Sequence, residues 1–170
     1  MFNPSKGIVI VLLTILIISC STDNKVPDFE LQTFKGKIIT STELKGKIVV
    51  LDFWDTHCGP CLKMMPHMEK LYSRYESNPD VVILVVNAGW QSIDEANNFV
   101  SNNDYDLPFT YMTKQESRKL KVREIPKTIV IDKQFNYRLQ YVGYDGYDPD
   151  KDQGPVNELD KLIEILLSEK

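Results

Sequence analysis

Two cysteines three residues apart carry the clearest chemistry in this sequence. Cys58 and Cys61 enclose a Gly-Pro dipeptide directly behind the apolar run 48–54. Thiols at this spacing at the start of a helix can close a small disulfide ring reversibly. A helix N-terminus favours thiolate, which makes Cys58 the candidate nucleophile and the more shielded Cys61 the candidate resolving thiol. The alternatives are a static disulfide or half of a zinc site, and zinc would need a second pair of ligands.

Three ionisable residues flank the cysteine pair. Asp52 lies inside the apolar run, where a carboxylate is costly unless it has a partner or a role. Burial would raise the pKa of Asp52 and make it a proton acceptor for Cys61, unless it is simply a paired aspartate without a catalytic part. His57 either stabilises the Cys58 thiolate when protonated or is merely exposed. Asp55 would oppose that effect by placing negative charge close to the thiolate.

Strand and helix patterns alternate around these residues and predict an α/β fold with a central mixed sheet flanked by helices. The apolar runs 48–54 and 81–87 are typical of central strands buried on both faces. Residues 61–75 are predicted to form the helix between them, with a kink at Pro66. The other expected elements are a hairpin over 30–39, a helical turn at 41–45, a helix from 92 to about 101, a strand at 108–112, a helix at 115–120, a hairpin of 127–132 with 138–144, and a helix at 157–167.

The N-terminal sequence predicts export. Lys6 precedes an apolar stretch, 8–18, that is too short to span a bilayer comfortably, and a small residue stands just before Cys20. This pattern is similar to the bacterial lipoprotein signal, in which the cysteine receives lipid, and an uncleaved membrane anchor is the alternative. We expect a signal peptide over 1–19, a tether over 20–25 and one folded domain over 26–170.

The charge balance argues against nucleic acid as a partner. The chain carries 20 basic and 24 acidic residues, for a net charge of −4, whereas nucleic-acid binding depends on basic contacts to phosphate. The acidic segment 145–155 is rich in Asp, Gly and Pro and is expected to be either a solvated connector or a docking loop.

Several separated motifs resemble the thioredoxin superfamily. They are Asp52-Phe53-Trp54, Cys58-Gly59-Pro60-Cys61, Pro66, and Ile125-Pro126 leading into 128–132. The start of the domain, Val26 to Leu31 with Gly36-Lys37 and Leu44 to Lys47, is similar to anchored extracytoplasmic thiol-disulfide oxidoreductases of the TlpA/ResA type. The resemblance implies a thioredoxin-like fold with an added N-terminal hairpin.

The same resemblance implies roles for individual residues. It implies a reversible Cys58–Cys61 disulfide, a proton-accepting Asp52 and a cis bond before Pro126. The expected substrate contacts are Trp54, His57, Gly59, Pro60 and Ile125. Relatives usually carry Trp before the first cysteine, where this chain has histidine, so the redox potential is less predictable than the reaction.

Together these features predict a membrane-anchored, extracytoplasmic protein-disulfide reductase, held by lipid on Cys20. The expected partners are exported proteins with disulfides, including apocytochrome c, and a membrane thiol-electron donor; no cofactor and no metal ion are expected. A peroxidase of this fold would need Pro and Thr at Leu51 and Asp55. A copper-delivery protein would need a histidine far downstream, whereas the only histidines are His57 and His67. These two activities and an idle binding domain are the alternatives.

Overall fold

The computed structural model describes residues 24–143 and 155–169. The predicted signal peptide, Cys20, most of the tether and the acidic segment up to residue 154 lie outside the described residues. Within those two ranges, no helix is both long and apolar enough to cross a membrane.

A single mixed sheet of seven strands forms the centre of the fold, in the order β2-β1-β5-β4-β3-β6-β7. The strands are β1 (Glu30–Thr33), β2 (Ile38–Thr40), β3 (Ile48–Trp54), β4 (Val81–Asn87), β5 (Phe109–Tyr111), β6 (Lys127–Ile131) and β7 (Tyr137–Val142). The parallel pairs are β3 with β4 and β4 with β5, while β6 runs antiparallel to β3. Every residue of β3 is buried, as the apolar run predicts for a central strand. The N-terminal hairpin extends the sheet by pairing β1 with β5.

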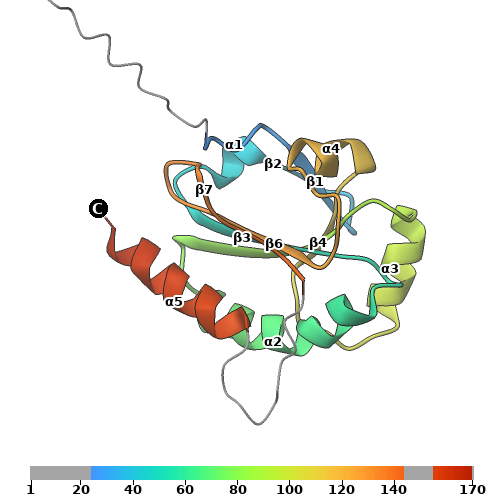
Figure 1. Cartoon of the computed structure of the whole chain (residues 1–170). Helices are drawn as coiled ribbons and strands as arrows, with labels where there is room; N and C mark the ends of the chain where they lie inside the picture. Colours follow the sequence, from blue (N-terminus) through green and yellow to red (C-terminus); the bar gives the residue numbers. More distant parts are fainter. Residues whose placement is uncertain (1–23, 144–154, 170) are drawn as a thin grey trace, which may run out of the picture.

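Helices cover both faces of this sheet, so the predicted α/β architecture is confirmed (Figure 1). They are α1 (Ser41–Leu44), α2 (Gly59–Tyr75), α3 (Ile93–Ser101), α4 (Lys114–Lys119) and α5 (Pro155–Ser168). In Figure 1, α2 and α5 lie under one face, whereas α1 and α4 lie over the other. The Tyr75 hydroxyl connects α2 to α5, because its single hydrogen is shared between Asp160 Oδ1 at 2.7 Å and Glu164 Oε1 at 2.9 Å.

Helix α2 begins two residues earlier than its periodicity predicts. Cys58 is the N-cap residue, and Pro60 occupies the first turn, where its missing N–H costs nothing. The helix continues through the exposed Pro66 to Tyr75. Its buried stripe includes Met64 and Met68, which pack between the sheet and α5. This packing holds α2 against the sheet and α5, directly after the turn that follows β3.

Candidate active site

The turn between β3 and α2 presents the cysteine pair at the N-terminus of the helix. Cys58 and Cys61 form a disulfide with their Cα atoms 5.2 Å apart. The Cys61 backbone N–H donates to Cys58 Sγ at 3.2 Å, so the first sulfur lies against the helix amides. Cys58 is partly exposed, whereas Cys61 is only 1% exposed. A partner molecule can therefore reach Cys58 more readily than Cys61.

Trp54 lies beneath the cysteines and not at the surface. Its side chain is fully buried and packs against Phe99 and Phe109, with ring centroids 5.4 and 5.3 Å away. It shares an apolar cluster with Cys61 and Met65. Because neighbouring aromatic rings cover the end of β3, the Trp54 side chain offers no exposed surface here, and its contact with a substrate stays a prediction. The ring instead supports the first turn of α2 from below.

Asp52 is buried in the centre of the sheet beside one polar partner. It is 2% exposed and pairs in register with Thr128 of β6, whose hydroxyl donates to Asp52 Oδ1 at 2.9 Å. Burial raises the pKa of Asp52 from 3.8 to about 7, although the Thr128 hydrogen bond acts in the opposite direction. The next residue, Phe53, places its carbonyl oxygen 4.0 Å from Cys61 Sγ. Asp52 thus lies one residue from the strand position that faces the buried sulfur.

The loop before β6 approaches the same site. The Ile125–Pro126 peptide bond is cis, and Pro126 is buried. Ile125 is partly exposed and packs against the apolar cluster that Cys58 also contacts. Gly59 and Pro60 are exposed at the start of α2. Ile125, Gly59 and Pro60, unlike Pro126 and Trp54, are therefore accessible to a substrate beside the disulfide.

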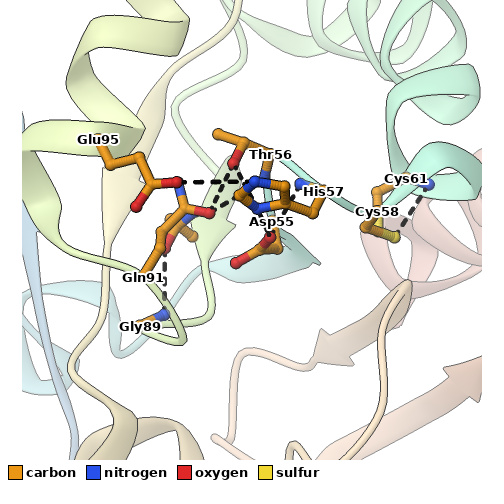
Figure 2. Close-up of polar contacts among 9 residues, drawn as sticks. Asp55, Thr56, His57, Cys58, Cys61, Gly89, Gln91 and Glu95 are labelled. Atoms are coloured by element: carbon orange, nitrogen blue, oxygen red, sulfur yellow. Dashed lines mark hydrogen bonds and ion pairs between the residues drawn. A yellow bond between two sulfur atoms is a disulfide. The ribbon is translucent and has the colours of Figure 1, made fainter.

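Figure 2 shows His57 between two carboxylates. Its Nδ1 lies 3.3 Å from Asp55 Oδ1, and its Nε2 lies 3.8 Å from Glu95 Oε1 of α3. Asp55 is buried and also accepts the backbone N–H of His57 at 2.9 Å. The exposed imidazole therefore links the turn before Cys58 to α3 and, when protonated, offsets negative charge near the disulfide. Across the described ranges, no group of three or more His, Cys, Asp or Glu side chains is placed to hold a metal ion.

Gln91, in the loop between β4 and α3, holds the same turn from the side. Its Oε1 accepts from the Thr56 backbone N–H at 3.1 Å and from the Thr56 hydroxyl at 2.8 Å (Figure 2). Its own carbonyl accepts from the Tyr111 hydroxyl at 3.1 Å. The sequence carries no local signal for this contact, because it joins positions 35 residues apart.

Gly89 fixes the path of this loop. It has φ +72°, and a Cβ added there would lie 2.6 Å from the Lys114 backbone nitrogen and 2.7 Å from the Thr113 carbonyl carbon. Its N–H donates to Asn87 Oδ1 at 3.1 Å. The loop therefore packs backbone against backbone onto the start of α4, which only glycine allows.

Replacing Gly89 with alanine is expected to lower the free energy of unfolding by about 2–3 kcal/mol, because a positive φ and a backbone collision act together. Gly36→Ala is the matched control, since Gly36 has φ +84° with nothing near an added Cβ. That variant is expected to lose only about 1 kcal/mol. Urea unfolding of both variants measures their free energies of unfolding. Equal losses in the two variants would contradict the prediction, because they would show that the backbone moves to remove the collision at position 89.

A thioredoxin-like fold with a disulfide at the start of its first long helix, beside a cis-proline loop, is that of a thiol-disulfide oxidoreductase. The profile of the AhpC/TSA family matches residues 22–139, and the chain belongs to that family.

Relatives with known names agree with this class. The thioredoxin-like protein YneN of Bacillus subtilis (strain 168) is 32% identical over 119 residues, which cover 70% of each chain. The thiol-disulfide oxidoreductase ResA of the same strain is 35% identical over 115 residues, covering 67% of this chain and 63% of ResA. The ResA of Halalkalibacterium halodurans is 37% identical, and the match spans 59% of its length.

Solved structures share the fold over most of the chain. A DsbE-type thiol:disulfide interchange protein from Chlorobium tepidum superposes with a TM-score of 0.69 at 26% identity, covering 85% of this chain and 96% of that one. The exposed lipoprotein thioredoxin Etrx1 of Streptococcus pneumoniae has a TM-score of 0.66 at 24% identity, covering 82% of this chain and all of that one. The likeness to Etrx1 concerns the fold alone.

Proposed function

We propose that this protein reduces disulfides in exported proteins through a dithiol–disulfide cycle of Cys58 and Cys61. The observation that carries the proposal is the asymmetry of the pair, in which the accessible sulfur belongs to the N-cap residue and the other is buried. In the reduced protein, the Cys58 thiolate attacks one sulfur of a substrate disulfide and expels the other sulfur as a thiolate. A mixed disulfide between Cys58 and the substrate results.

Cys61 then completes the reaction. Its thiolate attacks Cys58 Sγ, closes the internal disulfide and releases the second substrate thiolate. Two electrons pass from the cysteine pair to the substrate, so a thiol donor must return two electrons before the next cycle. Asp52 accepts the Cys61 proton in this step, because its burial keeps its pKa near neutral pH.

Ile125 and the exposed residues Gly59 and Pro60 form the substrate side of the site. An extended substrate segment would lie along the backbone before Pro126, next to the accessible Cys58. His57 would contact the same segment from the turn, since its side chain is 77% exposed.

The place of action that we propose is outside the cytoplasm, with the domain held at a membrane by lipid on Cys20. The sequence of residues 1–19, with Lys6 before a short apolar stretch and Cys20 after it, supports export and lipidation. The electron donor would then be a membrane thiol carrier, and apocytochrome c is one candidate among the exported substrates.

The reduction potential of the Cys58–Cys61 pair tests the proposed direction of electron flow. The purified protein is equilibrated in thiol buffers, and alkylated cysteines are counted by mass. A potential near or below about −270 mV, the value of thioredoxin, is expected for a reductase. A potential near about −120 mV would identify an oxidant instead and would contradict the proposal.

A further inference from the structure

A groove of about 460 Å³ lies between the β4–α3 loop and α4. Its lining residues are Trp90, Lys114, Arg118, Val122 and Arg123. Trp90 comes from the loop that Gly89 packs against the start of α4, and the other four belong to α4 and the chain that follows it. The groove is thus lined by one aromatic ring from the β4–α3 loop and by basic side chains from α4 and the chain after it, which we call the basic wall.

The basic wall is a local concentration of positive charge in an acidic protein. Residues 114–123 contain five basic residues and one acidic residue, although the whole chain has a net charge of −4. Glu116 is already engaged, because it pairs with Lys119 at 2.6 Å. In the described part of the chain, Lys114, Arg118 and Arg123 make no ion pair with a carboxylate. Their charges are exposed and available to a ligand.

Trp90 gives the groove an apolar surface. Its side chain is 41% exposed, which is unusual for a large aromatic ring in a domain whose other tryptophan is fully buried. Exposed tryptophan and arginine side chains are the types that dominate protein-recognition surfaces. A flat ring in one groove with guanidinium groups suits an extended chain that carries carboxylates.

Two residues of the groove are close in sequence to residues that border the cysteine pair. Arg123 stands two residues before Ile125, in the loop that ends at the cis proline. Trp90 precedes Gln91, whose side chain holds the turn at Thr56, two residues before Cys58. The groove is thus connected to the active-site turn through Gln91 and to the cis-proline loop through Arg123.

A buried lysine maintains the basic wall. Lys127 is 5% exposed, and its Nζ donates to the carbonyl of Lys121 at 3.0 Å and to that of Leu120 at 3.5 Å. These bonds hold the chain between α4 and Arg123 against the sheet. The backbone between α4 and Arg123, from which part of the basic wall projects, is thus fixed by the fold.

We propose that this groove binds an acidic, extended segment of the disulfide-bearing protein and so selects substrates with carboxylates near the disulfide. The selection rests on the proposed reductase function, whereas binding to the groove does not need the redox reaction. Both can therefore be measured separately.

Binding is tested first, without a disulfide. A fluorescein-labelled peptide of alternating Glu and Ser residues is titrated with the full-length oxidised protein, and its anisotropy is recorded. The affinity of the variant Arg118→Glu/Arg123→Glu for this peptide is expected to be at least about tenfold lower than that of the wild type, because charges at an interface speed association and attract the oppositely charged partner. The matched control is Lys70→Glu/Lys161→Glu, which makes the same charge change on α2 and α5, across the sheet from α4 (Figure 1). Its affinity is expected to stay within about twofold of wild type, because these charges lie beyond screening distance in moderate salt.

Substrate selection is tested with two peptides that contain the same internal disulfide, one flanked by Glu and the other by Gln. The ratio of kcat/KM for the acidic to the neutral peptide is expected to exceed one in the wild type and to fall about tenfold in Arg118→Glu/Arg123→Glu. The control variant keeps the wild-type ratio. If neither peptide is reduced by any form of the protein, the proposed function fails, while the anisotropy result still decides the groove.

Other outcomes would overturn the proposal. Equal affinity of both variants for the acidic peptide would place binding elsewhere. Equal affinity of the wild type for a Lys-Ser peptide would remove the charge argument. Vesicles containing anionic phosphatidylglycerol provide the last comparison. If the wild type binds these vesicles but not the acidic peptide, and Arg118→Glu/Arg123→Glu loses vesicle binding, the groove binds a membrane surface and the proposal is wrong. The thermal midpoints of both variants verify that they are folded.

Discussion

Replacing Cys58 with serine is expected to abolish disulfide reduction, lowering turnover by about 10³-fold or more, as loss of a nucleophile does in other enzymes. Cys58 is the accessible member of the pair, and its sulfur lies against the helix amides. Serine keeps the fold of the turn but cannot form a disulfide with the substrate. The loss is measured as the rate at which the reduced protein converts a disulfide peptide to its dithiol, with the product thiols alkylated and counted by mass spectrometry.

Replacing Cys61 with serine is expected to stop the same reaction at the mixed-disulfide intermediate. The buried resolving thiol is then missing, so the mixed disulfide between Cys58 and the substrate accumulates and is detected by mass. The control is Cys20→Ser, which makes the same chemical change at the third cysteine and should leave turnover of a soluble peptide unaltered. An adduct that forms on Cys61 in the Cys58→Ser variant would reverse the proposed roles.

Replacing Asp52 with asparagine is expected to stabilise the fold at neutral and alkaline pH. The pKa of Asp52 is raised from 3.8 to about 7 because the folded chain buries the carboxyl. Between these two pH values the folded protein holds a proton that the unfolded chain has released, so the free energy of unfolding decreases as pH rises. The stabilisation is complete below about pH 4 and is lost as the pH reaches about 7. At 1.36 kcal/mol per pKa unit, the upper limit of the change is about 4 kcal/mol.

Urea unfolding at about pH 4 and about pH 8 measures this effect, because the two proteins should be similar at the first pH and differ most at the second. Asparagine is nearly the same size as aspartate, and its carbonyl can still accept from Thr128. A variant that keeps the wild-type pH dependence would locate the titrating group elsewhere.

The same variant tests the proposed role of Asp52 in the reaction. If this carboxylate accepts the Cys61 proton, Asp52→Asn should slow decay of the mixed disulfide by about 10²-fold below the pKa of a free thiol. The difference should shrink at high pH, where Cys61 ionises without help. An unchanged decay rate in a more stable variant would show that Asp52 is paired within the sheet without a catalytic part.

Local sequence patterns determine most of the fold of this protein. Local patterns predict several elements directly, because periodicity, glycine and proline act within a few residues. These elements are β3, β4, α2 and the Cys58-Gly59-Pro60-Cys61 turn. The position of the cysteine pair at a helix N-terminus follows from the same short-range preferences. These features were sufficient to predict an α/β fold with a central mixed sheet and a redox-active cysteine pair, whereas the thioredoxin-like topology was implied by the resemblance of several separated motifs to that superfamily.

Only the tertiary structure decided how distant segments meet around that disulfide. Strand register brings Thr128 to Asp52, aromatic packing buries Trp54, and the β4–α3 loop places Gln91 on the turn before Cys58. The same loop brings Trp90 into one groove with Arg118 and Arg123. Such contacts depend on long-range packing and on the path of loops, which the type and spacing of neighbouring residues do not determine.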